Sequence, residues 1–440
     1  MSTPMYGHAI PLLELALKLT HFHRITFAVS ASTLDRITKD TDITAHGSHG
    51  PINFIAVTSD EISDGRLDEP AAHAGQVLQR FEGLFKVVRT FLLDNSNRFA
   101  AVIVDSLLGG PASVLYERHI PYYLFNASRA WLTQTILTFD IDEPEDFVKP
   151  DGISPSFNRR SEGYKYIDPF LETVKTCFME HCKTVNFAEG LIINSVREAE
   201  EETLMEIARW FPWMKEMKTF CVGPLNPRIK EKQGKKNEEK DDVQKWLDTQ
   251  DSRSVIYISF GSIAVPKPDE IMAIGEALLQ LTSPVVWSLK KEYYVYLPVD
   301  IQSELNKEGC KGNFVIVPWA PQKAVLAHPA VKVFISHCGW NSTLEALSYG
   351  VPVVCWPMFA DQLLNADFLA SVGVGKVLQG TGQVSVRLVP SADIASAVNE
   401  VTNCKNTYVE NALQWKAKIF FGQDEGGSFR EELLALTKSL

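Results

Sequence analysis

The chain has 440 residues, of which 45% are hydrophobic and 22% charged, and its formal net charge at pH 7 is −11. This composition is typical of a folded globular protein and excludes a largely disordered one. The acidic balance argues against nucleic acid or a membrane surface as partner, since both need clustered Lys and Arg. Because single cores stop growing at about 250–300 residues, we expect two domains.

Seven cysteines are scattered along the chain, a pattern typical of free thiols in a reducing compartment. Cys177, His181 and Cys182 lie close together, but no second ligand pair at zinc spacing follows, so we expect no metal site. No apolar stretch reaches the ~20 residues of a membrane helix, and the N-terminus lacks the pattern of a signal sequence. We therefore expect a soluble, cytoplasmic protein that acts as a monomer on small molecules.

Short apolar runs alternate with helical patterns in the first half of the chain, as in α/β proteins with parallel sheets. These runs predict strands at 25–29, 53–57, 101–104, 122–125 and 190–194. Apolar residues at helical spacing predict helices at 11–19 and 77–93. The segment 226–242 is densely charged and almost free of apolar side chains, which predicts a solvated linker.

The alternation resumes after this linker. Strands are predicted at 255–259, 285–289, 314–317, 331–336 and 351–355, and helices at 268–281 and 342–348. We therefore predict an α/β protein of two doubly wound, Rossmann-like domains that face each other across a cleft at the carboxyl ends of their strands. The first domain would comprise residues 1–225, joined by a C-terminal helix at about 425–440, and the second would comprise residues 243–424.

The segment 331–355 is the most informative part of the chain. It combines a strand, a Gly-containing turn at 337–340, a helix beginning near Asn341 or Ser342, and a second apolar strand. Ser342 and Glu345 are spaced as in a capping box. The N–H groups at a helix N-terminus bind phosphate, so a diphosphate is predicted there. On the residues alone, a plain strand-to-helix turn in which Glu345 only caps the helix stays open.

Two side chains and a second turn make this anion site more specific. His337 offers a hydrogen-bond donor, and Trp340 is expected to offer an aromatic face beside the anion. A second turn that could face phosphate follows the strand at 255–259 and contains Gly261 and Ser262.

Residues 319–362 read WAPQKAVLAHPAVKVFISHCGWNSTLEALSYGVPVVCWPMFADQ. In length and spacing this segment resembles the signature box of plant-type UDP-glycosyltransferases of glycosyltransferase family 1. Weaker matches at 222–224, 246–248, 259–262, 287 and 426–428 extend the resemblance over almost the whole chain. It implies the two-domain GT-B fold, with the sugar donor bound mainly by the C-terminal domain and the acceptor by the N-terminal one.

The resemblance also assigns roles to residues of the box. Trp319 would stack on uracil, with the Ala320 backbone and Gln322 nearby. Glu345 would accept hydrogen bonds from both ribose hydroxyls, a role that suits a carboxylate. The phosphates would be held beside Gly339 by His337, Asn341 and Ser342. The sugar hydroxyls would be read by Trp340, Asp361 and Gln362.

Two positions of the box refine this assignment. Gln362 is typical of members that use glucose, whereas a His would indicate galactose, so UDP-glucose is the expected co-substrate. Lys332 stands where the family usually has Gly, and we expect its side chain to face solvent.

Inverting transfer needs a base that removes the acceptor's proton as the acceptor attacks the anomeric carbon. His8 precedes a helical apolar run, and Asp105 ends the strand predicted at 101–104. On the residues alone, a surface or helix-capping His stays the simpler interpretation of His8. Both positions match the catalytic dyad of the family, in which the carboxylate orients the imidazole. The helix N-terminus and His337 would absorb the charge that develops on UDP, so we expect neither a metal nor a further cofactor.

The family normally begins with an apolar strand ahead of the catalytic His loop. Here only residues 1–5 precede that loop, so the first central strand is expected to be missing or cut short. The main alternative is therefore a UDP-sugar-binding protein with impaired catalysis. A dinucleotide oxidoreductase lacks the GxGxxG after an early strand, and a UDP-sugar epimerase is not expected to carry the whole box.

The sequence does not identify the acceptor beyond a small, mostly hydrophobic molecule such as a phenolic, flavonoid or terpenoid. Four residues are candidates to line its pocket, although such residues at helical spacing more often belong to the core: Phe81, Phe85, Trp131 and Leu132.

Overall fold

The computed structural model describes residues 1–40, 47–57, 74–138, 184–225, 242–261, 264–305, 312–359, 361–381, 388–403, 405 and 407–440. Two compact units divide the chain. The first comprises Met1–Asn226 together with Gly422–Leu440, and the second comprises Pro227–Phe421. Of the predicted linker at 226–242, only Asp242 lies within the described residues, and it begins a helix.

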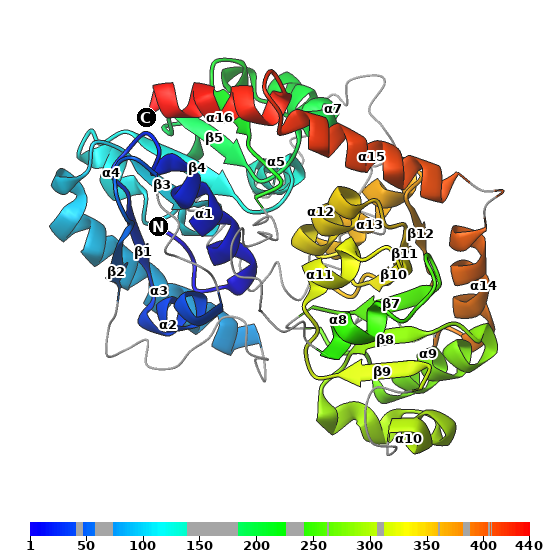
Figure 1. The fold of residues 1–440 in the computed structure, drawn as a ribbon. Helices are drawn as coiled ribbons and strands as arrows, with labels where there is room; N and C mark the ends of the chain where they lie inside the picture. The colour runs from blue at the N-terminus through cyan, green and yellow to red at the C-terminus, as the bar shows by residue number, and fades with distance from the viewer. Residues whose placement is uncertain are drawn as a thin grey trace, which may run out of the picture. The chain divides into compact units, whose positions relative to one another are not determined.

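The first unit contains six described strands in two parallel sheets (Figure 1). The sheet of β1 and β2 is formed by Thr26–Val29 and Asn53–Ala56. The sheet β3-β4-β5-β6 is formed by Val102–Asp105, Tyr122–Asn126, Gly190–Ile193 and Lys218–Cys221. The helices described in this unit are α1 (Tyr6–Leu19), α2 (Ala31–Asp40), α3 (Ala74–Asn95), α4 (Ser113–Glu117), α5 (Ala130–Thr138), α7 (Arg197–Trp210) and α16 (Ser428–Ser439).

Helices cover both faces of these sheets. Alternate residues of β4 point to opposite sides: Tyr122 and Leu124 join one hydrophobic cluster, whereas Tyr123 and Phe125 join the other. Helices α3, α4, α5 and α7 contribute to the first cluster, and α1, α2 and α16 contribute to the second. Burial on both faces explains why these strands appear in the sequence as continuous apolar runs.

An extended segment at the start of the chain joins the two sheets. The N–H of Ser2 donates to the carbonyl of Ala28 in β1 at 3.1 Å. On the other side, the Met1 amino group donates to the carbonyl of Ile103 at 2.7 Å, and the Met1 carbonyl accepts from the N–H of Asp105 at 3.0 Å. Residues 1–3 therefore lie between β1 and β3, in the place of the first central strand.

The last helix, α16, is fastened to the sheet of the first unit. Arg197 donates from Nε and Nη2 to the two carboxylate oxygens of Glu432, at 2.6 and 2.8 Å. The N–H of Cys221, at the end of β6, also donates to Glu432 Oε2 at 2.8 Å. On the same helix, Phe429 and Leu436 are buried in the hydrophobic cluster. The C-terminal residues thus belong to the unit formed by the first half of the chain (red in Figure 1).

The described strands of the second unit form one parallel sheet of six in the order β12-β11-β10-β7-β8-β9. In chain order its strands are β7 (Val255–Ser259), β8 (Val285–Ser288), β9 (Phe314–Val317), β10 (Val331–Ser336), β11 (Val353–Cys355) and β12 (Gly375–Val377). Its helices are α8 (Asp242–Leu247), α9 (Pro268–Leu281), α10 (Val299–Leu305), α11 (Gln322–Ala327), α12 (Trp340–Tyr349), α13 (Gln362–Ser371), α14 (Ser391–Thr402) and α15 (Tyr408–Gly422). The strand order reverses between β7 and β10, which is the arrangement of a doubly wound nucleotide-binding sheet.

Lys332 does not simply face solvent, contrary to expectation. Its side chain is half-buried, and its Nζ donates to Ser283 Oγ at 2.7 Å. The pairing of β10 with β7 shifts register between Val331 and Val333, so the strand bulges at the lysine. Burial lowers the pKa of the Lys332 amine. The bulge lies at the start of β10, at the opposite end of the strand from the turn at 337–340.

Three further features concern the surface and the thiols. Among the residues that the structure describes, no helix combines the length and the hydropathy needed to cross a bilayer. Within those residues no group of three or more His, Cys, Asp or Glu is placed to hold a metal ion, and Cys177, His181 and Cys182 lie outside them.

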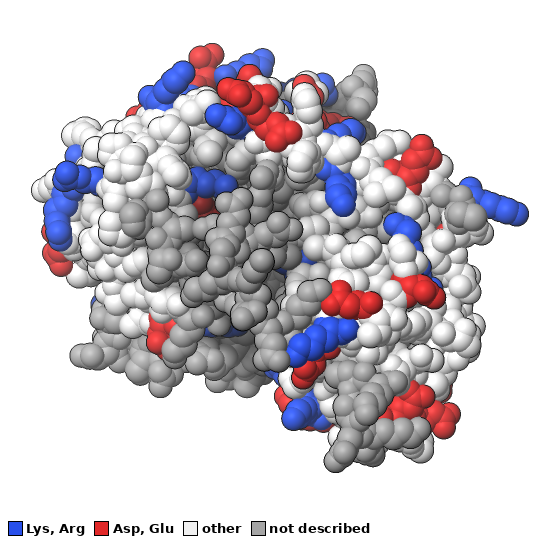
Figure 2. Space-filling view, in the orientation of Figure 1, with Lys and Arg blue, Asp and Glu red and all other residues white. Residues whose placement is uncertain are grey.

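The described cysteines, Cys221, Cys338 and Cys355, are free and buried. On the face drawn in Figure 2, basic and acidic side chains are interspersed.

Replacing Glu432 by Ala removes the acceptor shared by Arg197 and the N–H of Cys221. We expect the free energy of local unfolding of α16 and β6 to fall by about 2–3 kcal/mol, because the partly buried guanidinium of Arg197 loses its carboxylate partner. Glu431→Ala, on the exposed face of the same helix, should change it by less than about 0.5 kcal/mol. Hydrogen exchange read by mass spectrometry on peptides of α16 and β6 measures both variants, and equal effects would contradict the assignment.

Candidate active site

Two candidate turns lie side by side at the carboxyl edge of the second unit's sheet. β7 and β10 are adjacent, and their last residues, Ser259 and Ser336, are paired. The chain leaves β7 through Gly261 and leaves β10 through the turn at 337–339. Because the strand order reverses between these two strands, this edge is where doubly wound sheets bind nucleotides.

The imidazole of His337 lies between the two turns, and two glycines make room for it. A Cβ on Gly261 would lie 2.8 Å from Cε1 and Nε2 of the ring, and a Cβ on Gly339 would lie 2.6 Å from Nε2. Gly261 also has a φ of +76°, which glycine adopts without strain. Any larger residue at either position would displace His337.

The environment of His337 keeps its ring neutral. Burial lowers the pKa of His337 to about 4, although a hydrogen bond with the backbone of Ser259 opposes the shift. Its Nδ1 is buried and has no hydrogen-bond partner in the part of the chain that the structure describes. A neutral imidazole can still donate an N–H to an anion, so charge on His337 is not needed for binding.

The expected capping box is wrong, because α12 begins at Trp340 and has Gly339 as its N-cap without a side-chain cap. Ser342 and Glu345 instead both accept hydrogen bonds from Nε2 of Gln322, at 2.9 and 2.7 Å. Since Gly339 supplies no capping side chain, the N–H groups of the first turn are suited to an anion in its place.

Trp340 does not present an aromatic face beside the anion, contrary to expectation. Its side chain is 4% exposed and packs edge-on against Phe368, with the ring centroids 6.0 Å apart. At the start of α12 this residue would therefore meet a ligand through its backbone N–H. The next residue, Asn341, is partly exposed in the same turn.

A buried polar network surrounds Glu345. The hydroxyl of Tyr257 donates to Gln322 Oε1 at 3.2 Å, and Nε2 of the same amide donates to Glu345. Burial raises the pKa of Glu345, opposed by the charge of Lys323 and by the Gln322 hydrogen bond. Trp319, three residues before Gln322, is 75% exposed. An exposed indole and a buried, oriented carboxylate are together suited to a nucleobase and its ribose.

The two ends of the signature segment each contribute a buried candidate: Ala320 lies just before α11, and Gln362 is the first residue of α13. Asp361 accepts a hydrogen bond from Asn365 Nδ2 at 2.9 Å. Oε1 of Gln362 accepts from the backbone N–H groups of Met358 and Phe359, at 2.9 and 3.1 Å. These bonds fix the amide of Gln362, whose Nε2 is the end suited to a sugar hydroxyl. Ser262, the remaining candidate, lies outside the described residues.

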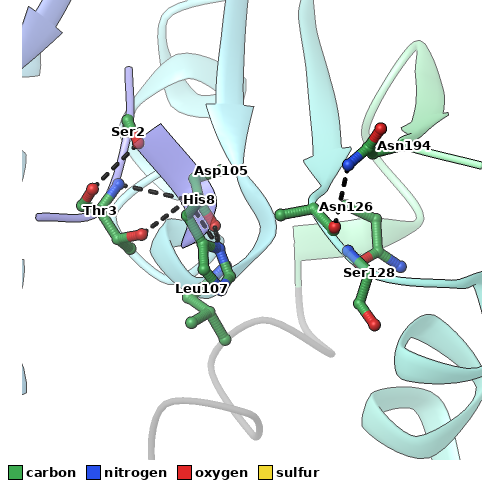
Figure 3. Close-up of polar contacts among 9 residues, drawn as sticks. Ser2, Thr3, His8, Asp105, Leu107, Asn126, Ser128 and Asn194 are labelled. Carbon is green, nitrogen blue, oxygen red and sulfur yellow. Dashed lines mark hydrogen bonds and ion pairs between the residues drawn. The ribbon is translucent and has the colours of Figure 1, made fainter. Parts of the chain in front are cut away.

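The two residues expected to form a dyad meet in the first unit, although they are 97 positions apart (Figure 3). His8 lies in the first turn of α1, and Asp105 is the last residue of β3. Nδ1 of His8 lies 3.2 and 3.1 Å from Oδ1 and Oδ2 of Asp105. The imidazole is 20% exposed, whereas the carboxylate is fully buried.

Donors around Asp105 keep this buried carboxyl ionised. Burial alone would raise the pKa of Asp105, but the charge and hydrogen bond of His8, with hydrogen bonds from Thr3 and Leu107, hold it below its usual value. An ionised carboxylate facing Nδ1 selects the tautomer with its proton on that nitrogen, which leaves Nε2 as the basic atom.

The acceptor candidates divide between core and partly buried positions. Trp131 is 7% exposed, and its Nε1 has no hydrogen-bond partner in the described structure. Phe85 packs against the hydrophobic core of the first unit, and Leu132 is partly buried. The side chain of Phe81 lies outside the described residues.

Sequence reasoning missed two residues of these networks. Thr3 is buried against Asp105, and the hydroxyl of Tyr257 orients Gln322. Neither carries a local signal, because Thr3 precedes the first helix in a short polar stretch and Tyr257 appears as an ordinary residue of an apolar strand.

Comparison with known proteins agrees with this geometry. Residues 211–419 match the family model described as UDP-glucoronosyl and UDP-glucosyl transferase. UDP-glycosyltransferase 84A3 of Arabidopsis thaliana is 29% identical over 461 residues, covering 97% of this chain and 92% of that protein. Gallate 1-beta-glucosyltransferase 84A24 of Punica granatum is also 29% identical, with 97% and 85% covered.

A similar solved structure is that of Medicago truncatula UGT71G1 complexed with UDP-glucose, which is 25% identical. The match has a TM-score of 0.78 and covers 99% of this chain and 96% of that one. These matches agree with two features of the structure. One is the strand order of the second unit, and the other is the place of the signature segment where that order reverses. The chain is thus a glycosyl-transferring enzyme with the GT-B fold, similar over almost its whole length to plant-type UDP-glycosyltransferases of glycosyltransferase family 1.

Proposed function

We propose that this enzyme is an inverting, UDP-glucose-dependent glycosyltransferase that transfers glucose to a hydroxyl or other nucleophile of a small hydrophobic acceptor. The observation that carries the proposal is the contact of His8 Nδ1 with the buried Asp105 carboxylate at 3.1 Å. An ionised partner that sets the tautomer is what a general base needs, because its second nitrogen must be unprotonated when the acceptor arrives.

In this proposal the second unit binds UDP-glucose. Trp319 stacks on uracil beside the backbone of Ala320, and the carboxylate of Glu345 accepts hydrogen bonds from the ribose hydroxyls. The support is that Trp319 is 75% exposed and that Gln322 already orients Glu345. The diphosphate lies at the start of α12, where the N–H groups of the first turn and the neutral ring of His337 donate to it.

The chemical step follows from the position of the base. Nε2 of His8 removes the acceptor's proton as the acceptor oxygen forms a bond to the anomeric carbon. The bond from that carbon to the β-phosphate oxygen breaks, so the configuration inverts and UDP leaves with the electron pair. Asp105 stabilises the imidazolium that forms. The N-terminus of α12 stabilises the charge on UDP, which makes the step independent of a metal ion in this proposal.

The support for glucose and for the acceptor class comes from Gln362 and from one named relative. The amide of Gln362 is held by two backbone N–H groups, which directs its donor end for a sugar hydroxyl. One relative is named for gallate, an acid with phenolic hydroxyls, so both carboxylates and phenols belong among the nucleophiles to test.

Replacing His8 by Ala should strongly slow the transfer of hexose without removing the residual rate. We expect a fall in kcat of about 10²–10⁴-fold, the range that general-base catalysis supplies. Mass spectrometry of products from UDP-glucose with a mixed phenol, flavonoid, terpenoid and aromatic-acid library measures it. His21→Ala, an exposed histidine just after the same helix, is the matched control and should turn over normally.

Undiminished transfer by His8→Ala would remove His8 from its role. Binding of UDP-glucose without transfer to any acceptor, in the unmodified protein, would instead favour a UDP-sugar-binding protein without catalysis.

Replacing Glu345 by Gln should weaken donor binding, because a neutral amide accepts less strongly from the ribose hydroxyls than a carboxylate. We expect the Kd for UDP-glucose to rise about 10–100-fold, as for the loss of a hydrogen bond to a charged group. Isothermal titration calorimetry measures it, with Glu276→Gln on the exposed face of α9 as control. An unchanged Kd in Glu345→Gln would place the ribose elsewhere.

Stability at acid pH should report on His337. Its pKa of about 4 in the folded chain lies below the ordinary histidine value of 6.5, so between these two pH values the unfolded state binds a proton that the folded state does not. Stability is therefore lost as the pH falls, by about 2 kcal/mol between pH 7.5 and 5. His337→Gln removes this component, and urea denaturation of the second unit at the two pH values should show a smaller loss than in wild type. His21→Gln is the control, and the same loss in wild type and His337→Gln would show that the ring is protonated when folded.

A further inference from the structure

Thr3 is held against the proposed dyad although it belongs to neither catalytic position. Its side chain is fully buried in the segment between β1 and β3. Oγ1 of Thr3 donates to Oδ2 of Asp105 at 2.7 Å, and its backbone N–H points to the same oxygen at 3.3 Å. In Figure 3 Thr3, Asp105 and His8 converge on one point at the end of β3.

Each oxygen of the Asp105 carboxylate has its own donor. The N–H of Leu107 donates to Oδ1 at 3.0 Å, and Thr3 donates to Oδ2. His8 Nδ1 lies almost equally far from both oxygens. The N–H of Leu107 and the hydroxyl of Thr3 therefore bind different oxygens of the carboxylate. Together they fix the rotation of the carboxylate about its bond to Cβ. With Thr3 Oγ1 removed, Oδ2 keeps only the longer backbone contact and His8.

The backbone hydrogen bonds of residues 1–3 do not depend on the Thr3 hydroxyl, so a substitution that removes this hydroxyl leaves them intact. Ser2 donates to Ala28, and Met1 accepts from the N–H of Asp105. Neither bond involves the Thr3 side chain, so residues 1–3 stay between the sheets when the hydroxyl is lost.

We propose that Thr3 is a positioning residue of the dyad. Its hydroxyl fixes the Asp105 carboxylate so that Nδ1 of His8 stays protonated and Nε2 points as a base toward the acceptor. The proposal rests on the function proposed above for His8. It predicts that Thr3 acts on the chemical step and through His8 alone, whereas a buried hydroxyl with a structural role affects stability only.

The test compares Thr3→Val, which keeps the shape of the side chain and removes its donor, with Thr3→Ser, which keeps the donor. We expect Thr3→Val to lower kcat about 10–100-fold, the loss typical of a group that orients a functional side chain, with KM for both substrates within about twofold. Thr3→Ser should restore kcat. Thr20→Val is the matched control, because Thr20 is a buried threonine of the same unit whose hydroxyl donates to the Leu17 carbonyl.

A double variant separates the two proposals. In the His8→Ala background Thr3→Val should cause no further loss of kcat, because the residue that it positions is gone. An additional loss there, or a wild-type kcat in Thr3→Val alone, would overturn the role of Thr3 and leave that of His8 intact. Undiminished turnover in His8→Ala would overturn the proposed function instead.

If Thr3→Val does not fold, Thr3→Cys takes its place. A thiol is close in size to the threonine side chain but donates weakly, so kcat should fall with folding preserved. Full activity in a folded Thr3→Cys would then contradict the proposal.

Discussion

The buried carboxylate of Asp105 is the group on which the arrangement of the first unit's site depends. Removing a charge from water costs several kcal/mol unless donors replace the lost hydration. Here His8, Thr3 and Leu107 supply them from three separate segments of the chain. The pKa of Asp105 stays low for that reason. The same donors determine where the carboxylate points, so charge and geometry have one cause.

In the second unit a buried side chain is kept uncharged, whereas Asp105 in the first unit is kept charged. His337 is kept neutral by burial, with its pKa lowered to about 4, and it lies between two turns at the switch point of the sheet. The glycines at 261 and 339 leave the space that the ring occupies. A neutral donor beside a helix N-terminus suits a diphosphate, because the helix already provides positive potential and a second charge would have to be desolvated. The first site thus keeps a charged carboxylate by surrounding it with donors, whereas the second would offer the proposed diphosphate a ring that carries no charge.

The candidate site was predictable where residues and spacing carry the chemistry. The signature segment indicated Trp319, His337 and Glu345, and the ends of predicted elements indicated His8 and Asp105. The capping box was wrong because Ser342 and Glu345 bind Gln322, a side chain 20 and 23 positions away, instead of the nearby helix start. The aromatic face of Trp340 was wrong for a related reason, since Phe368 covers it from another helix. Local spacing does not show which distant residue competes for a side chain.

The sequence by itself determined the α/β class and most of the described strand positions, because parallel strands buried on both faces appear as continuous apolar runs. It missed β6 and β12, at Lys218–Cys221 and Gly375–Val377, which are short and contain a lysine and small or polar residues. Only the tertiary structure decided that Thr3 meets Asp105 across 102 positions and that Tyr257 orients Gln322 across 65. Such hydrogen bonds depend on the register of separate strands and loops, which is a property of the folded sheet and leaves no periodic pattern in the sequence.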